Sequence, residues 1–296
     1  MSFLDQAAHL RQLALESHQL QLKLKKEKIK SRIITVTSGK GGVGKTSLVV
    51  NLALAFAQLG KRVTILDADL GLANIDVMLG VVPQHTLYDV VHGRKNLAEI
   101  AIRGPEGIIL LPGGSGLTEL ADLPEDKRIS LINKLQSLDE AADIILIDTG
   151  AGLSRTVLSF VAAADEMLLV TTPEPTAIRD AYGIIKVAAK QQLQQKMQLI
   201  VNQVKNAQEG KEIAERLITV SRKFLQVELQ FIGSICSDQR VVMAVKQQQP
   251  FLNLFPHSQA AENVRRIAAA LLAVPVKKTR GLPGFLNRLI QLWEKA

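Results

Sequence analysis

Short apolar segments recur along the chain at the spacing of strands that are separated by helices. Most of them are continuous apolar runs, which are typical of strands buried on both faces, whereas half-buried strands alternate apolar and polar residues. The pattern predicts an α/β fold in which a mainly parallel sheet is flanked by helices on both faces. The expected strands are residues 33–37, 62–67, 107–112, 143–148, 166–172, 197–202 and 229–234.

The stretches between these strands have helical composition and periodicity. They predict helices at residues 47–58, 125–138, 154–163, 176–192, 211–225, 240–248 and 259–272. Segments at the two ends lie outside this core and divide the chain into three parts. The expected parts are a helix with a basic linker (1–31), an α/β domain (32–273), and a connector with a final amphipathic helix (274–296).

A glycine-rich segment between the first strand and the first helix has the pattern of a phosphate-binding loop, or P-loop. In such a loop the glycines let backbone N–H groups face a polyphosphate, Lys45 can reach the β and γ phosphates, and the Thr46 hydroxyl can ligate Mg²⁺ directly. A glycine-rich turn with two solvated lysines is the alternative, and it leaves the acids of the next strand unexplained. The residues assigned to nucleotide binding are Gly39, Lys40, Gly41, Gly42, Val43, Gly44, Lys45, Thr46 and Ser47.

Carboxylates end two of the later strands. Asp67 and Asp69 follow the apolar run of residues 63–66, and Asp148 follows residues 144–147. Ligands of open α/β sheets bind at the carboxyl ends of the strands. There, Asp67 and Asp148 could hold Mg²⁺ through water, and Asp69 could orient or deprotonate the attacking water. An isolated pair such as Asp67 and Asp69 would be interpreted as a loop cap, but its position after a P-loop favours the functional role.

Gly150 and Gly152 come directly after Asp148. Glycine backbone can reorganise easily, so this segment is a candidate switch beside the γ-phosphate, with Gly152 as the switch residue. A tight turn from strand to helix is a compatible alternative.

Charge and cysteine content exclude several classes of protein. The net charge of +8 comes from the two ends, because residues 1–32 contain seven Lys or Arg against three acids, and residues 277–296 contain five against one. We therefore expect no direct binding of nucleic acid by the body of the protein. The single cysteine, Cys236, excludes a disulfide framework or paired-thiol metal site within one chain. With no secretory signal or spanning run, we expect a cytoplasmic protein whose membrane contact is peripheral.

Four segments together resemble the MinD/ParA family of deviant Walker A ATPases, over roughly residues 32–272. They are GKGGVGKT at 39–46, DADLGLANID at 67–76, DTGAG at 148–152 and TTPEPT at 171–176. The resemblance implies a P-loop NTPase fold, ATP and Mg²⁺ as ligands, and slow hydrolysis in an ATP-dependent homodimer. Residues that match functional positions of the family are Lys45, Thr46, Asp67, Asp69 and Asp148.

Further roles follow from the same resemblance. Lys40 is implied to reach the phosphates of the partner protomer, and Asn74 falls in switch I. Asn202 lies where a base-reading asparagine ends its strand, and Asp238 lies in the adenine-side loop. Ser237 departs from the family, where proline is common before that aspartate, so the adenine contacts are less defined. Iron proteins of this fold need paired cysteines and its tyrosine kinases carry a tyrosine-rich tail, and this chain has neither. GTPases offer an N-K-x-D motif that reads guanine. This motif is missing too, which favours adenine as the base.

The N-terminal segment DQAAHLR, residues 5–11, resembles the activator helix of the FlhG branch of this family, also called FleN or YlxH, whose members regulate flagellar number. Gly150 agrees with this branch, because division-site MinD proteins usually have proline there. The resemblance implies stimulation of the GTPase FlhF, and contacts with flagellar motor-switch proteins and a flagellar transcription regulator. Its partner-binding residues would be Asp5, Gln6, Leu10 and Arg11, with Gln6 entering the FlhF active site. A helix folded on its own domain is the alternative.

The C-terminal segment is an amphipathic helix whose apolar face carries Phe285, Leu286, Leu289, Ile290 and Trp293. It is too short to span a bilayer, and its composition suits an interfacial helix on an anionic membrane. It resembles the membrane-targeting helix of MinD and FlhG proteins. A helix docked on the core is the alternative, and both states could exist with ATP switching between them.

Together these observations predict an ATP-dependent, membrane-cycling ATPase that regulates flagellar number or placement. Three alternatives remain open: a division-site MinD-type protein, a ParA-like partition ATPase, and a nucleotide-locked scaffold with negligible turnover.

Overall fold

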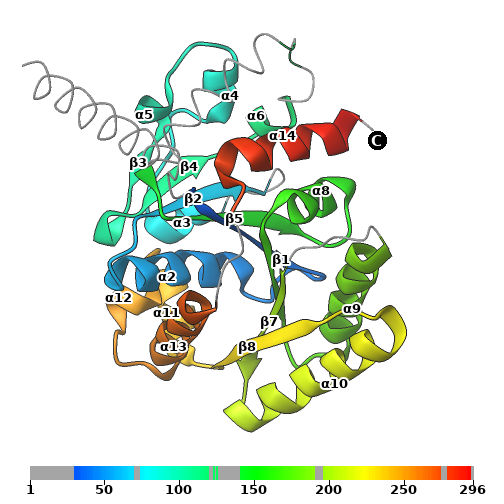
Figure 1. The fold of residues 1–296 in the computed structure, drawn as a ribbon. Coiled ribbons are helices and arrows are strands. Elements are labelled where there is room, and N and C mark those ends of the chain that lie inside the picture. The colour runs from blue at the N-terminus through cyan, green and yellow to red at the C-terminus, as the bar shows by residue number, and fades with distance from the viewer. Residues whose placement is uncertain are drawn as a thin grey trace, which may run out of the picture.

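The computed structural model describes residues 30–69, 74–119, 123, 125, 141–190, 196–274 and 279–294. The expected N-terminal activator helix and nearly all of the expected helix 125–138 lie outside these residues. An eight-stranded sheet in the order β3-β4-β2-β5-β1-β6-β7-β8 forms the centre of the fold (Figure 1). Its strands are β1 (Arg32–Ser38), β2 (Val63–Ala68), β3 (Ile102–Arg103), β4 (Ile109–Pro112), β5 (Ile144–Ala151), β6 (Glu166–Thr171), β7 (Lys196–Val204) and β8 (Leu229–Cys236).

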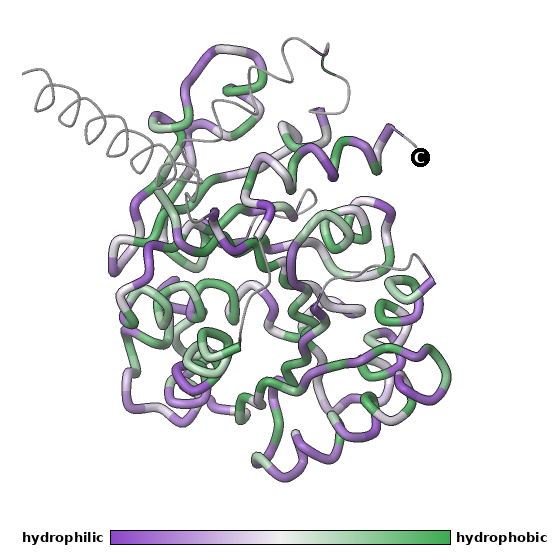
Figure 2. Tube along the Cα trace, in the orientation of Figure 1, coloured by the Kyte–Doolittle hydropathy of each residue, from purple (hydrophilic) through white to green (hydrophobic). Residues whose placement is uncertain are grey.

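All neighbouring strands pair in parallel except β3 with β4, which are antiparallel. Three inner strands, β1, β2 and β6, are buried at every position. Burial on both faces accounts for their continuous apolar runs. The hydropathy of the chain follows this arrangement, with apolar strands inside and polar segments outside (Figure 2). The predicted α/β class with a mainly parallel sheet is therefore confirmed.

Helices cover both faces of the sheet. One face packs against α2 (Lys45–Gln58) and α13 (Gln259–Ala273), and the other against α8 (Arg155–Ala163), α9 (Pro175–Lys190), α10 (Ala207–Leu225) and α14 (Gly281–Glu294). The remaining described helices are shorter: α3 (Ile75–Leu79), α4 (Leu87–Val91), α5 (Leu97–Ile100), the 3-10 turn η1 (Pro105–Gly107), α6 (Gly116–Glu119), α11 (Gln239–Lys246) and α12 (Phe251–Leu254).

Apart from the helix expected at 125–138, which the structure does not test, the predicted strands and long helices agree with the observed ones to within a few residues at their ends. Strand β5 continues three residues beyond Asp148, so the glycine-rich segment after this acid begins inside the strand. The sequence pattern missed β3 and the helices α3, α4, α5, α6 and α12. All of these elements have five residues or fewer, which is too short for a periodic signal.

The C-terminal helix α14 is docked on the core. Leu282, Phe285, Leu286, Leu289 and Ile290 are buried in one cluster with residues of β1, β5 and α8. The Phe160 ring stacks on Phe285 at 6.2 Å between centroids and meets Trp293 edge-on at 5.9 Å. The alternative of a core-docked helix is thus the observed arrangement. Among the described residues, none of the helices has the length and apolar character needed to cross a bilayer.

The start of α14 is bonded to the beginning of the sheet. Asp165, between α8 and β6, accepts hydrogen bonds from the backbone N–H groups of Arg280 and Ile33. Burial raises the pKa of the Asp165 carboxyl, and these two N–H groups oppose the shift. Thr279 donates its hydroxyl to the Lys30 carbonyl at 3.0 Å. The start of α14 therefore lies beside Lys30, where the described part of the chain begins.

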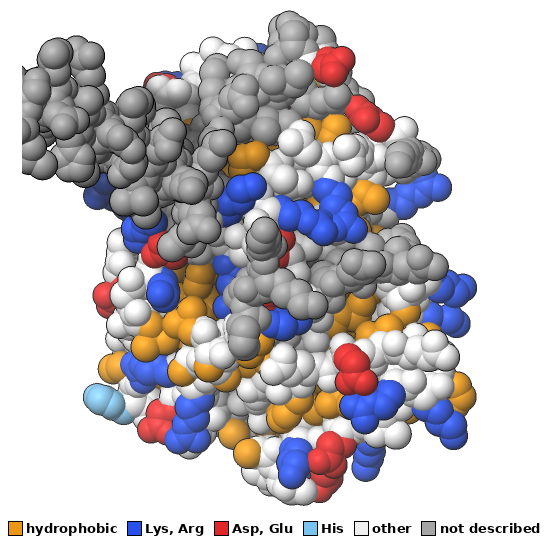
Figure 3. Space-filling view, in the orientation of Figure 1, with side chains coloured by type: hydrophobic (Ala, Val, Ile, Leu, Met, Phe, Trp, Pro, Cys, Tyr) orange, Lys and Arg blue, Asp and Glu red, His pale blue; other side chains and the backbone are white. Residues whose placement is uncertain are grey.

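On the face shown in Figure 3, Lys and Arg side chains are interspersed with acidic, apolar and uncharged ones.

A buried ion pair ties β1 to β6 and α13. Arg32 binds Glu166 through two hydrogen bonds and donates a third to the Leu271 carbonyl, and the side chains of the pair are 8% and 2% exposed. An isolated charge at this depth would be costly, so the two side chains depend on each other.

Replacing Arg32 with Met should lower the free energy of unfolding by about 3–5 kcal/mol, because Glu166 would be left buried without its partner. Urea denaturation followed by circular dichroism measures this. The control is Arg62→Met, which breaks the exposed pair with Asp143 and should cost at most about 1 kcal/mol. Equal losses in the two variants would contradict a structural role for the buried pair.

Candidate functional site

The P-loop connects the centre of the sheet to the first long helix. It leaves β1 at Ser38 and enters α2 at Lys45. Gly42 and Gly44 have φ values of +79° and +84°, in the left-handed region that favours glycine. At Gly39 a Cβ would lie 2.3 Å from the Asp180 carbonyl carbon, so this glycine is required by the close approach of α9. Backbone conformation or close packing thus explains why glycine stands at each of these loop positions, apart from Gly41, which has open space around it.

The start of α2 offers free backbone donors. Its N-cap residue is Gly44, and no side chain caps the helix there. Backbone N–H groups of a first turn lack partners within the helix, and the helix dipole gives them a partial positive charge. Such a helix start binds phosphate well.

Three predicted residues meet at the carboxyl end of β5. Lys45 and Asp148 form an ion pair with Nζ and Oδ1 2.6 Å apart, and their side chains are 8% and 1% exposed. The Thr46 hydroxyl also lies beside Asp148. Burial raises the pKa of the Asp148 carboxyl, while the Lys45 ammonium opposes this shift. Lys45 therefore supplies the positive charge that this acid needs.

The second acid lies on the neighbouring strand. Asp67 on β2 is in register with Asp148 on β5. Its burial raises the pKa of the Asp67 carboxyl to about 7, a shift that the backbone N–H of Asp69 opposes by donating to Oδ1 at 3.1 Å. The structure thus brings Lys45, Thr46, Asp67 and Asp148 together, as the sequence predicts.

This set of groups fits a Mg²⁺-bound polyphosphate. A hydroxyl and two carboxylates are the hard oxygen ligands that Mg²⁺ prefers. Ser47 adds a buried hydroxyl oxygen that has no partner within the described residues and lines the adjoining cavity. Thr46 would hold the ion directly, and Asp67 and Asp148 through water. The ion would neutralise charge on the phosphates.

The switch candidates lie beside this set. A Cβ at Gly150 would lie 3.4 Å from Asp69 Oδ1, so the end of β5 is next to the predicted catalytic acid. Gly152 has a φ of +94° and donates its N–H to the Ser38 carbonyl at 2.8 Å, just before the P-loop. Asn74 is the N-cap of α3. Residues 70–73, which precede it in the predicted switch I, lie outside the described part of the chain.

Lys40 is placed differently from Lys45. Its ammonium binds Glu174 and, at 3.3 Å, the Thr176 hydroxyl, both in the TTPEPT segment. Its side chain is 42% exposed, against 8% for Lys45. The two lysines of the loop therefore lie in different environments. Lys40 is at the surface, and Lys45 is beside the buried acids.

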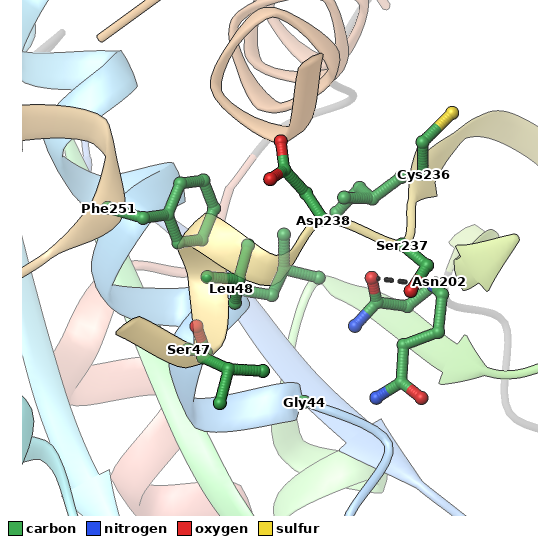
Figure 4. A pocket seen from close by; sticks show the side chains of 12 residues that line it. Gly44, Ser47, Leu48, Asn202, Cys236, Ser237, Asp238 and Phe251 are labelled. Atoms are coloured by element: carbon green, nitrogen blue, oxygen red, sulfur yellow. Dashed lines mark hydrogen bonds between the residues drawn. The ribbon is translucent and has the colours of Figure 1, made fainter. Parts of the chain in front are cut away.

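A cavity of about 230 Å³ adjoins the P-loop on the side of β7 and β8 (Figure 4). Asn202 and Asp238, the predicted base-side residues, both line it together with Ser237. Asn202 donates Nδ2 to the Val43 carbonyl at 2.8 Å and accepts from the Gln203 N–H at 2.9 Å. An amide group has two further hydrogen-bonding positions, so these contacts leave Asn202 able to bind a base.

Asp238 has a structural role as well. It is the N-cap of α11 and accepts from the Arg240 N–H at 3.0 Å. Its ion pair with the Arg240 side chain lowers the pKa of the Asp238 carboxyl. Asp238 is therefore ionised at neutral pH and fixes the start of α11, directly after Ser237.

The apolar walls of the cavity were missed by the sequence analysis. They come from distant parts of the chain: Leu48, Ile235, Val241, Val242 and Phe251. Phe251 is placed by α12, which is held to α2 because Asn51 accepts from the Leu252 N–H at 2.8 Å. Gln203 was missed too. Its position directly after Asn202 was the only local signal, and the walls have no local signal.

The other predicted residues lie elsewhere. Asp5, Gln6, Leu10 and Arg11 fall outside the described residues. The five predicted membrane residues are on the docked face of α14, with Trp293 only partly buried.

Comparisons with known proteins agree with this geometry. A family model described as an AAA domain (AAA_31) matches residues 31–202. Antiactivator FleN of Pseudomonas aeruginosa is 41% identical over 88% of this chain and 94% of its own length. Flagellum site-determining protein YlxH of Helicobacter pylori is 32% identical over 88% and 90%.

Solved structures give the same result. MinD in the MinC:MinD complex of Aquifex aeolicus is 28% identical with a TM-score of 0.65, covering 84% of this chain and 100% of that one. MinD of Pyrococcus horikoshii, solved with Mg-ADP, is 26% identical with a TM-score of 0.65, covering 81% and 96%. The chain therefore belongs to the MinD/ParA family of P-loop ATPases, in the branch that includes FleN and YlxH.

Proposed function

We propose that this protein is a slow ATPase that dimerises with ATP, cycles on the membrane and regulates the number or placement of flagella. The observation that carries the proposal is the different placement of the two P-loop lysines. Lys45 is buried at the acids that would organise Mg²⁺, whereas Lys40 is exposed beside Glu174. An exposed cation next to a phosphate site can reach a ligand held by a second protomer, and a buried one cannot.

The catalytic assignment follows from the acids. Asp69 lies beside Asp67 and the end of β5, where the γ-phosphate of a nucleotide on the P-loop would lie. A carboxylate there can orient the attacking water or take its proton. We assign Asp69 to this step, and Asn74 and Gly152 to the segments that respond to the γ-phosphate.

The flagellar assignment rests on relatives named antiactivator and flagellum site-determining protein. It includes FlhF as the partner of residues 5–11, motor-switch proteins, and a transcription regulator. A division-site role and a partition role are the alternatives within the fold. Deletion of the gene separates them, because loss of a flagellar regulator changes the number or position of flagella, loss of a division-site protein displaces septa, and loss of a partition protein impairs DNA segregation.

The membrane assignment concerns α14. Its buried apolar residues would each contribute about 1.5–3 kcal/mol relative to exposure to water. Transfer of this face from the core to lipid exchanges one apolar environment for another, so undocking onto a membrane costs much less than undocking into water. A dimer presents two such helices, and linking them can raise avidity by roughly 10²–10⁴. We infer that the ATP-bound dimer is peripherally membrane-bound and the monomer cytoplasmic.

Asp69→Ala should bind ATP and accumulate as a dimer, because hydrolysis no longer returns it to the monomer. Lys40→Ala should bind ATP and remain monomeric, because its charge is missing from the interface. Analytical ultracentrifugation with ATP and Mg²⁺ separates these states, and phosphate release gives the turnover. Lys211→Ala, on the exposed surface of α10, is the control and should behave as wild type. Wild-type turnover by Asp69→Ala would remove Asp69 from the mechanism, and undetectable turnover by wild type would favour a nucleotide-locked scaffold.

A synthetic peptide of residues 1–25 should raise the GTPase rate of the cognate FlhF in the absence of the ATPase domain. The same peptide with Gln6→Ala should stimulate less, because Gln6 is assigned to the FlhF active site. FlhF that has been shown to bind GTP serves in both assays. If neither peptide changes its rate, residues 5–11 are not an activator.

Wild type should pellet with anionic liposomes in ATP and much less in ADP. Trp293→Glu should stay in the supernatant while still dimerising, because it places a charge on the apolar face of α14. Gln291→Glu adds the same charge to the exposed face of this helix and should pellet as wild type. Equal pelleting in ATP and ADP, or full pelleting of Trp293→Glu, would show that α14 is not an ATP-gated anchor.

A further inference from the structure

Gln203 has a backbone conformation that its residue type rarely adopts. Its φ is +58°, in the left-handed region where glycine and asparagine are usual. It lies near the end of β7, at the irregularity where the register with β8 shifts between Val201 and Val204. Unusual backbone conformations of this kind persist where the surroundings impose them, and they cluster at functional sites.

The conformation changes where the side chain points. Successive side chains of a regular strand lie on opposite faces of the sheet. Asn202 and Gln203 are successive residues, yet both line the cavity beside the P-loop. The left-handed backbone at Gln203 therefore breaks the alternation and turns a second amide side chain toward the loop. In Figure 4 the Asn202 side chain and Gly44 border the same cavity.

The two amides bind consecutive carbonyls of the P-loop. Asn202 Nδ2 donates to the Val43 carbonyl at 2.8 Å, and Gln203 Nε2 donates to the Gly42 carbonyl at 3.4 Å. The C=O and N–H groups of a trans peptide point in opposite directions. Holding the Gly42 carbonyl toward β7 thus turns the N–H of Val43 away from β7, and holding the Val43 carbonyl does the same for the N–H of Gly44.

We propose that Gln203 is a positioning residue for nucleotide binding. It fixes the Gly42 peptide so that the Val43 N–H faces the phosphates, as the second half of a clamp that Asn202 begins. This inference rests on the proposed binding of nucleotide by the P-loop. Because Gln203 acts through the loop, it affects any ligand that carries a diphosphate, with or without a base.

The test compares binding of Mg-ADP and Mg-pyrophosphate by isothermal titration calorimetry of the full chain. Gln203→Met keeps the length of the side chain and removes the donor, and Gln203→Gly removes the side chain while fitting the left-handed backbone. Both should lose about threefold to tenfold in affinity for both ligands, the effect of one neutral hydrogen bond. The thermal unfolding midpoint without ligand should be unchanged or higher for Gln203→Gly, because glycine relieves the backbone.

Gln226→Met is the matched control. Gln226 is also an exposed glutamine with positive φ, at 56°, but it caps the end of α10 away from the cavity. This variant should bind both ligands as wild type does. Wild-type affinity in Gln203→Met, or a loss for Mg-ADP alone, would overturn the inference, since the latter would mean a contact with the base. Failure of the wild type itself to bind either ligand would overturn the proposed function as well.

Discussion

The arrangement of this fold around its P-loop depends on two buried carboxylates on neighbouring strands. Asp67 and Asp148 are 5% and 1% exposed at the carboxyl edge of the sheet, and burial raises the pKa of both. Such acids are costly unless positive charge lies close by. Lys45, at the first turn of α2, supplies that charge to Asp148. The position of α2, and with it the P-loop, is therefore tied to the acids that would organise Mg²⁺.

The sheet order makes this possible. Strand β5 lies between β1 and β2, so the strand that ends in Asp148 is adjacent to both the P-loop strand and the Asp67 strand. Parallel neighbours present their carboxyl ends at one edge. Residues more than eighty positions apart thus meet through the order of the strands. On the opposite side of the loop, β7 and β8 end at the cavity, where two amides bind loop carbonyls.

Sequence patterns predicted the parts of this site that have local signals. The P-loop, the acids at strand ends, and the strands themselves are encoded in short segments with defined spacing. The cavity walls could not be predicted, because residues such as Phe251 come from distant parts of the chain and are placed by tertiary contacts, among them the bond of the Leu252 N–H to Asn51. The conformation of Gln203 accompanies an irregularity in the pairing of β7 with β8. The residue types in this segment do not predict that irregularity. The short strand β3 likewise depends on pairing with β4.

The environment of the C-terminal helix α14 is another feature that the sequence could not predict. An apolar helix face is equally suited to a protein core and to lipid, so its composition leaves both environments open. The structure places Phe285 against Phe160 and ties the start of the helix to Asp165. In the proposed membrane cycle, this docked arrangement is the place to which the helix would return, and its release would be a competition between two apolar environments. A change that disturbs the core-docked state would shift this competition without touching lipid.

The central claim is that the buried acids and Lys45 form a site for Mg²⁺-bound nucleotide. The most direct measurement is the affinity for ADP with and without Mg²⁺, by calorimetry, in wild type and in Asp148→Asn. Comparing the two conditions within each protein removes any difference in their stability. The account predicts that Mg²⁺ strengthens ADP binding by wild type and has little effect on Asp148→Asn. An equal Mg²⁺ effect in the two proteins would contradict it.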